Sequence, residues 1–215
     1  MGIRAFWTSL TLTICLFASA TNVAAESRTQ TAASYVELGD KLAHVKDFDR
    51  AIGSYNIALQ FAPDFAPAYL KRGIVYETLG EISKAISDYT KALDILPKLT
   101  TALYNRGNLR LNEGDLDGAL SDFNQAVLND SRYAMAYNNR GIAKASKGDM
   151  DGAMADFNEA IRIDSHHPEA YVNRGLVRLQ QGLVMEAEHD FAKSIELRPA
   201  LRSVIDDRVS QISQR

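Results

Sequence analysis

Small and large hydrophobic residues along this chain recur with a spacing of 34 residues. Glycine repeats at this spacing in one series and alanine in another. The glycines are Gly39, Gly73, Gly107, Gly141 and Gly175, and the alanines are Ala51, Ala85, Ala119, Ala153 and Ala187. A period of roughly 20–50 residues is typical of an array of stacked units. The pattern therefore predicts a repeat array over most of the chain.

The array divides into five contiguous units, within which positions are numbered 1 to 34. The units are 32–65, 66–99, 100–133, 134–167 and 168–201. Position 4 holds Tyr35, Tyr69, Leu103, Tyr137 and Tyr171, and position 24 holds Tyr55, Tyr89, Phe123, Phe157 and Phe191. Apolar or small residues keep helical spacing on both sides of a break in each unit. Each unit is therefore expected to be a helical hairpin.

Glycine marks the break between the two expected helices. Position 15 holds Gly80, Gly114, Gly148 and Gly182, followed in three units by an acid, Glu81, Asp115 or Asp149. Glycine suits the left-handed end of a helix, and an acid favours the start of the next one. Pro63, Pro97 and Pro199 close the second helices. Lys46 replaces the first turn glycine, and Ser131 and Ser165 replace the closing proline, so looser joints are expected there.

The two ends of the array differ from its interior. Residues 26–31 are polar and are interpreted as a linker. At the other end, residues 201–215 are predicted to form a capping helix, because an array needs an outer lid with one polar face. The apolar stripe of this helix is Leu201, Val204, Ile205, Val209 and Ile212.

The period and its landmark residues resemble tetratricopeptide (TPR) repeats over residues 32–201. The resemblance rests on the aromatic residues at positions 4 and 24, the glycine and alanine series, a second small residue such as Ala160, and the closing prolines. Ser194 departs mildly from the second small position. The resemblance implies an all-α fold, a right-handed superhelical α-solenoid of helical hairpins with a C-terminal capping helix. It also implies a role in binding other proteins.

Two charged positions recur in four of the five units. Position 7 holds Arg72, Arg106, Arg140 and Arg174, and position 23 holds Asp88, Asp122, Asp156 and Asp190. These positions face each other in an antiparallel hairpin that turns at position 15, so four Arg–Asp pairs are predicted between the helices. Partial burial would make the loss of one partner costly. The alternative is four solvated surface pairs worth about 0–1 kcal/mol each.

Asparagine recurs on the face of the first helices that lies opposite the inward stripe. The residues are Asn105, Asn139 and Asn173 at position 6, with Asn108, Asn112 and Asn138 nearby. By the TPR resemblance, this face lines a concave groove in which asparagines hold the backbone of an extended peptide. An amide offers both a donor and an acceptor to such a backbone. Alternatively, asparagine is only tolerated on an exposed helix surface. Lys71, Ile74, Tyr104 and Ile142 are expected beside these residues.

Composition narrows the choice of chemistry. The chain has a formal net charge of −3, which does not favour nucleic acid. Its four histidines have no metal-binding spacing, and we find no phosphate loop or nucleophile motif, so we expect no metal, no small-molecule cofactor and no enzyme activity. Two Asp-x-Asp-Gly fragments, at Asp115 and Asp149, faintly resemble a calcium loop but are better explained as helix starts.

Residues 1–25 differ from the rest of the chain. Arg4 precedes an apolar run that ends in Val23-Ala24-Ala25, which is typical of a secretory signal peptide. A membrane anchor or a lipoprotein signal at Cys15 are the alternatives. The sequence therefore predicts an exported protein, most simply periplasmic, or extracellular if it is secreted further.

These observations lead to two hypotheses about function. The first is a non-catalytic adaptor that binds an extended peptide or protein tail in the concave groove. The second is a scaffold subunit of a cell-envelope complex that uses the convex face or the end repeats. Both require a protein partner, whose identity the pattern does not indicate.

Overall fold

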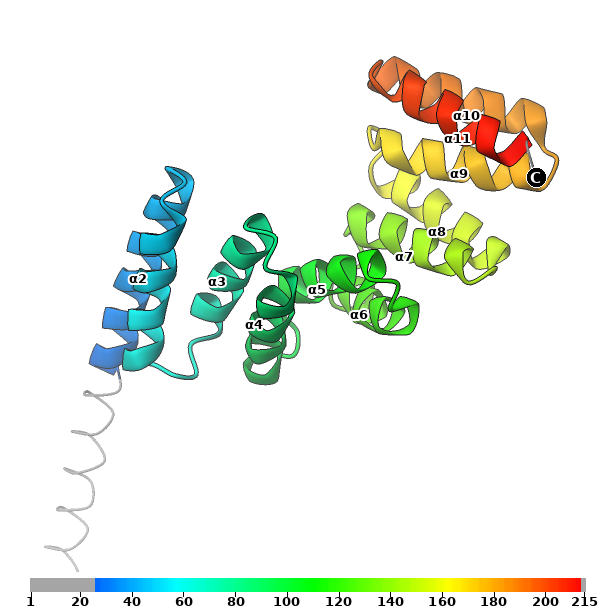
Figure 1. The fold of residues 1–215 in the computed structure, drawn as a ribbon. Helices are drawn as coiled ribbons and strands as arrows, with labels where there is room; N and C mark the ends of the chain where they lie inside the picture. The colour runs from blue at the N-terminus through cyan, green and yellow to red at the C-terminus, as the bar shows by residue number, and fades with distance from the viewer. Residues whose placement is uncertain (1–25, 214–215) are drawn as a thin grey trace, which may run out of the picture. The chain divides into compact units, whose positions relative to one another are not determined.

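The computed structural model describes residues 26–213, so the predicted signal peptide lies outside the described residues. All regular secondary structure in residues 26–213 is helical (Figure 1). The chain divides into two compact units, Met1–Pro97 and Lys98–Arg215, which are considered separately.

The first unit contains two helical hairpins. Residues 26–44 are helical and precede α2 (Phe48–Phe61), and α3 (Ala66–Thr78) pairs with α4 (Ile82–Ile95). Residues 26–31, predicted as a linker, are the first turns of the opening helix. Helix α3 also contacts α2, so the two hairpins stack on each other.

The second unit contains three hairpins and a final single helix. The hairpins are α5 (Thr100–Asn112) with α6 (Leu116–Asn129), α7 (Ala134–Ser146) with α8 (Met150–Ile163), and α9 (Pro168–Gln180) with α10 (Val184–Leu197). The last helix is α11 (Leu201–Ser213). Helix α7 contacts both α5 and α9, so the first helices of successive hairpins form one layer.

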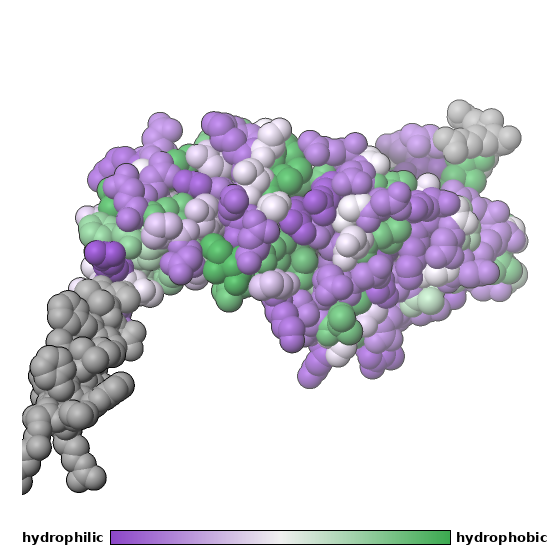
Figure 2. Space-filling model, turned by 90° about the horizontal axis from the view of Figure 1, so that it is seen from below, coloured by the Kyte–Doolittle hydropathy of each residue, from purple (hydrophilic) through white to green (hydrophobic). Residues whose placement is uncertain are grey.

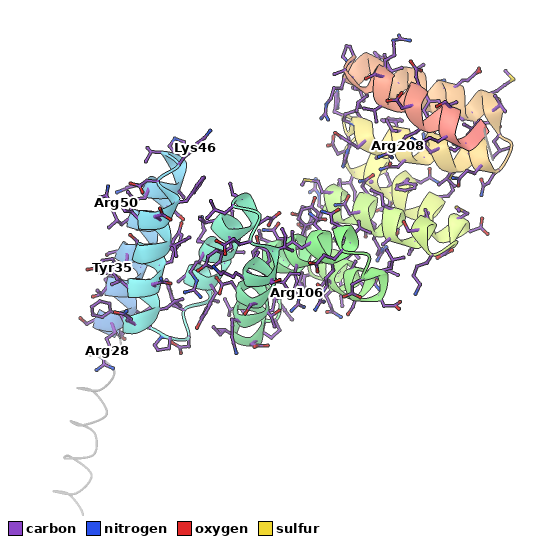
Figure 3. All side chains as sticks on the ribbon, in the orientation of Figure 1. Arg28, Tyr35, Lys46, Arg50, Arg106 and Arg208 are labelled. Carbon is purple, nitrogen blue, oxygen red and sulfur yellow. The ribbon has the colours of Figure 1, made fainter. Side chains whose placement is uncertain are left out.

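The turns within the hairpins adopt a left-handed backbone. Gly80, Gly114, Gly148 and Gly182 have φ angles of 74°, 82°, 86° and 79°. Lys46 occupies the same place in the first hairpin with φ 63°, at the tip labelled in Figure 3. The joint therefore keeps the geometry of the others despite lacking glycine, at the cost of a strained lysine.

The connections that lack the closing proline are held by aspartate side chains. The carboxylate of Asp130 accepts a hydrogen bond from the backbone N–H of Arg132 at 2.9 Å, and Asp164 accepts one from His166 at 2.9 Å. Such Asx turns replace the conformational restriction that proline provides. Both second helices accordingly end at the position equivalent to that of α4.

The core of each hairpin is built from small residues against one ring. A Cβ atom added to Gly141 would lie 2.6 Å from the ring of Phe157, and Ala153 and Ala160 are fully buried beside it. The equivalent glycine and ring touch in every unit. Glycine is therefore needed here for close approach of the helices, in agreement with the predicted hairpin packing.

Helix α11 covers the end of the third hairpin in the second unit. Ile205 is 3% exposed and packs with Val172, Ala187 and Phe191. Val204, which belongs to the predicted apolar stripe, is 41% exposed. The capping helix therefore buries only part of its apolar stripe, and Val204 stays partly exposed.

The surface is mostly hydrophilic on the face shown in Figure 2, with hydrophobic residues in separate areas. Within residues 26–213, no helix combines the length and the apolar character that a membrane span requires.

Candidate peptide-binding groove

Each of the four predicted Arg–Asp pairs is present, and each is bidentate. The Nε···Oδ2 distances are 2.7, 3.0, 2.8 and 2.9 Å for the pairs of Arg72, Arg106, Arg140 and Arg174. The corresponding Nη2···Oδ1 distances are 2.7, 2.7, 2.6 and 2.6 Å. Two parallel N–H···O bonds fix both partners, so these pairs join the two helices of a hairpin in a defined orientation.

The aspartates of these pairs are buried, so the pairs are not solvated surface contacts. Asp88, Asp122, Asp156 and Asp190 are 4%, 2%, 3% and 0% exposed. In the last three hairpins a second cation one helical turn further on also binds the carboxylate. These cations are Arg110 at 2.9 Å, Lys144 at 2.9 Å and Arg178 at 2.6 Å. The sequence analysis missed them, although position 11 is basic in all three units.

The paired arginines also bind the preceding hairpin. Arg140 Nη1 donates to Asn124 Oδ1 at 3.0 Å, and Arg174 Nη1 donates to Asn158 Oδ1 at 2.8 Å. Arg72 makes the same bond to Asn56 in the first unit. Each asparagine precedes its arginine by 16 residues, a spacing that could have revealed the contact. The arginine thus joins three helices, and the hydrogen bond to Asp156 raises the pKa of Arg140.

The asparagines of the first helices form a hydrogen-bonded chain across α5, α7 and α9. Asn173 Nδ2 donates to Asn138 Oδ1 at 2.9 Å, and Asn138 Nδ2 donates to Asn139 Oδ1 at 2.8 Å. Asn139 Nδ2 in turn donates to Asn108 Oδ1 at 2.6 Å and to the Tyr104 hydroxyl at 3.3 Å. The amide nitrogens of Asn139 and Asn173 are therefore used within the chain, which the sequence analysis did not foresee.

Asn138 does not face solvent as predicted. It is 4% exposed, because the close packing of α7 against α9 places its position between the helices. Asn105 is half-buried and Asn112 is exposed near the end of α5. Tyr104 is also occupied within the fold, since its ring lies 4.9 Å from that of Tyr133. The predicted asparagine face is thus partly a structural contact between first helices.

The remaining predicted residues lie in the first unit. Lys71 and Ile74 are on α3, and Lys71 forms an ion pair of 2.9 Å with Asp40. Lys71 is therefore engaged by a residue of the preceding hairpin. The groove described below contains neither residue, since it belongs entirely to the second unit.

Two adjoining cavities line the first-helix layer of the second unit. A cavity of about 320 Å³ is bounded by Asn138, Asn139, Ile142, Glu169, Val172, Asn173, Leu201, Val204 and Arg208. A second cavity of about 260 Å³ is bounded by Ile142, Ala145, Ser146, Met150, Phe157, Asn173, Leu176, Val177, Gln180 and Arg208. They share Ile142, Asn173 and Arg208 and therefore adjoin, and the two cavities together are here called the α7–α9 groove. Figure 3 labels Arg208, which extends from α11.

The α7–α9 groove combines apolar walls with amide groups. Asn173 uses its amide nitrogen for Asn138, which leaves its carbonyl oxygen as an acceptor beside the shared wall. Ile142, Met150 and Leu176 provide apolar surface. A few polar groups in a mostly apolar cleft are the usual composition of a binding site.

The acidic fragments that resemble a calcium loop serve as helix caps. Asp115 Oδ1 accepts from the backbone N–H of Gly118 at 3.0 Å, and Asp149 Oδ1 accepts from Gly152 at 2.9 Å. Among the described residues, no group of three or more histidine, cysteine or acidic side chains is placed to hold a metal ion.

Several solved structures have the same fold. The MamA protein is 28% identical, with 81% of this chain and 95% of MamA covered and a TM-score of 0.71. YrrB, described as a TPR protein with an unusual peptide-binding site, is 22% identical, with 90% and 97% covered and a TM-score of 0.72. The pilF protein of Pseudomonas aeruginosa is 19% identical, with 86% and 90% covered and a TM-score of 0.69. A comparison with curated proteins gave no match.

Family models described as tetratricopeptide repeat match residues 66–98, 104–168 and 168–201, which together make up more than half of the chain. The matches to 66–98 and 168–201 span one predicted unit each. The architecture is an α-solenoid, the kind of surface that protein-interaction adaptors use. The chain belongs to the tetratricopeptide-repeat family.

Proposed function

We propose that the chain is an adaptor that holds an extended segment of a partner protein in the α7–α9 groove. The observation that carries this proposal is that two neighbouring cavities share Ile142, Asn173 and Arg208 in their linings. A continuous groove suits an extended chain, whereas a single closed cavity suits a small molecule.

The groove offers the two kinds of contact that an extended peptide needs. The Asn173 carbonyl oxygen accepts from a peptide N–H without selecting a side chain. The apolar walls around Met150 and Leu176 then accept alternate side chains, since every second residue of an extended chain points to the same side. YrrB, a protein of the same fold that is described as having an unusual peptide-binding site, supports this use of the fold.

The groove is also held rigidly, which favours binding. The asparagine chain and the bidentate pair of Arg140 and Asp156 connect α7 to its neighbours. A surface that is ordered before binding loses less conformational entropy when the partner arrives. The amide nitrogens that the sequence analysis assigned to peptide binding thus contribute by positioning the groove.

Capture of the native partner tests the proposal. The Ile142→Asp variant places a charge on the wall shared by both cavities, and Val184→Asp places the same charge on the exposed α10 surface as a matched control. We expect affinity purification from native cells to lose the partner with Ile142→Asp and to retain it with Val184→Asp. Equal recovery with both variants, each shown to be folded by circular dichroism, would reject the groove.

The second candidate, a scaffold that uses its end repeat, has one observation in its favour. A cavity of about 500 Å³ lies between α10 and α11, bounded by residues such as Leu179, Ile195 and Val209. Val184, which lines this cavity, is 49% exposed. Loss of the partner with Val184→Asp alone would favour this scaffold role in an envelope complex.

We further propose that the chain acts outside the cytoplasm, in the periplasm or beyond. The pattern of residues 1–25 supports export. N-terminal sequencing of the protein from fractionated cells tests it: a mature chain that begins at Glu26 is expected in the exported fraction, and an intact Met1 in the cytoplasmic fraction would contradict it.

A further inference from the structure

Among residues 26–213, Arg208 is a cation without a partner, and it lies on the wall that the two cavities of the α7–α9 groove share. It lines both cavities, and within the described residues it makes no ion pair or hydrogen bond. The neighbouring cations differ in this respect, since Lys144 binds Asp156 and Arg174 binds Asp190. Arg208 is an exposed residue, so its guanidinium is available to a ligand.

Glu169, the acid that lines the groove, is already engaged. Glu169 Oε1 binds Arg198, and Glu169 Oε2 lies 3.1 Å from His167 Nδ1. Its charge is therefore directed to residues outside the groove. The groove has a positive centre in a chain whose formal net charge is −3.

Apolar surface flanks this charge on both sides. Val172, Leu201 and Val204 line one cavity, and Ala145, Met150 and Leu176 line the other. Residues i and i+2 of an extended chain point the same way about 6.6–6.8 Å apart, so three alternate side chains can occupy the first cavity, the centre and the second cavity. The Asn173 acceptor lies at the shared wall, where the backbone of such a segment passes.

We propose that the α7–α9 groove selects a segment in which a carboxylate lies between two apolar side chains, with Arg208 binding the carboxylate. This inference rests on the proposed function and specifies the chemistry of the partner. The planar guanidinium forms two parallel hydrogen bonds with a carboxylate, which an amide of the same shape cannot match. The carboxylate belongs to an aspartate or glutamate side chain of the partner.

Synthetic peptides test the inference on the purified full chain. The first probe is a labelled nonapeptide, blocked at both ends, with glutamate at its centre, leucine two residues away on each side and serine elsewhere. The second has glutamine at the centre. We expect fluorescence anisotropy to show about five- to tenfold tighter binding of the glutamate peptide, the range for a charged hydrogen bond at a partly solvated site.

Variants of α11 provide the controls. Arg208→Gln should remove the preference for glutamate while leaving the affinity for the glutamine peptide unchanged. Arg208→Glu should prefer a peptide with lysine at the centre. Arg202→Gln changes an arginine of the same helix that lines the cavity between α10 and α11, and should keep the preference.

The outcomes separate this inference from the proposed function. Equal binding of the glutamate and glutamine peptides, a preference that survives Arg208→Gln, or no binding of either peptide would overturn the role of Arg208. Capture of the native partner that depends on Ile142 would, in the same case, leave the adaptor function intact. If the peptides did not bind and capture of the native partner did not depend on Ile142, the groove itself would be rejected as the binding site.

Discussion

Arg140 and Asp156 form a bidentate ion pair across one hairpin, with Nε···Oδ2 and Nη2···Oδ1 distances of 2.8 and 2.6 Å. The carboxylate is 3% exposed and also binds Lys144 at 2.9 Å. The remaining nitrogen of the arginine reaches Asn124 on the preceding hairpin. One arginine therefore connects the helices within a hairpin and the hairpins to one another.

Removal of Arg140 should strongly destabilise the second unit. Arg140→Ala leaves a buried carboxylate with one cation, and breaking a buried pair costs about 3–5 kcal/mol. Arg140→Ala with Asp156→Ala should cost less than the sum of the single changes, with a coupling of about 1–3 kcal/mol measured by urea denaturation. The exposed pair of Lys193 and Glu196 is the control, where we expect a coupling below about 0.5 kcal/mol. Additivity at Arg140 and Asp156 would refute the structural role.

Addition of one methyl group to Gly141 should also destabilise the fold. The new Cβ would lie 2.6 Å from the Phe157 ring, which other helices hold in place. We expect Gly141→Ala to lower the free energy of unfolding by about 1–3 kcal/mol through overpacking. Gly53→Ala is the matched control, because nothing lies within 4 Å of a Cβ added to Gly53. In the interior of α2, alanine is more stable than glycine by about 0.5–1 kcal/mol, so this change should stabilise the fold. If Gly141→Ala and Gly53→Ala changed the free energy of unfolding in the same direction, the close approach of the Phe157 ring to the backbone would be contradicted.

Replacement of Lys46 by glycine should stabilise the first unit. Lys46 has φ 63°, a left-handed conformation that costs roughly 1 kcal/mol in a residue with a side chain. Lys46→Gly should therefore raise the thermal midpoint of that unit. The reverse change, Gly148→Lys, should lower the midpoint of the second unit, since Gly148 has φ 86°. A lower midpoint for Lys46→Gly would show that the lysine side chain stabilises the first unit by more than its left-handed backbone destabilises it.

Tyr133 should make the protein sensitive to alkaline pH. Burial, and to a lesser degree Tyr104 and Asp130, raise the pKa of Tyr133 from 10.0 to about 12. The folded state then binds more protons than the unfolded state above the unfolded pKa, so stability falls as the pH rises from about 10 to about 12. Tyr133→Phe should lose less stability over this range when melting is followed by circular dichroism. Burial also raises the pKa of Tyr55, so part of the loss should remain. If the stability of wild type and Tyr133→Phe fell equally with pH, Tyr133 would not be the source of the alkaline sensitivity.

The hairpins and the ion pairs could be predicted from the sequence because both depend on spacing within one unit. The 34-residue period defines which residues face each other about the turn, so Arg72 and Asp88 were identified without knowledge of the packing between units. The glycine at position 8 and the ring at position 24 were identified for the same reason. The family matches and the solved structures support this repeat fold.

Contacts between units were harder to predict, since they depend on how far one helix is rotated against the next. Asn138 is 4% exposed and lies against α9, while its sequence neighbour Asn139 is half-buried, although both line the same cavity. Turning the helix about its axis by the angle between two successive residues would exchange these two environments. The helical period alone does not define that angle. The contact of Asn124 with Arg140 was missed for the same reason. Arg208 could not be assigned, because its role depends on where α11 packs.

Photo-cross-linking in native cells tests most directly whether a partner lies in the α7–α9 groove. A photoreactive amino acid is placed at Leu176 on the groove wall, and at Met185 on the exposed start of α10 for comparison. Mass spectrometry then identifies the partner and the cross-linked peptide. We predict one extended partner segment cross-linked at position 176 and none at position 185. Partner cross-links confined to position 185, with none at position 176, would contradict groove binding and place the contact at the end of the array.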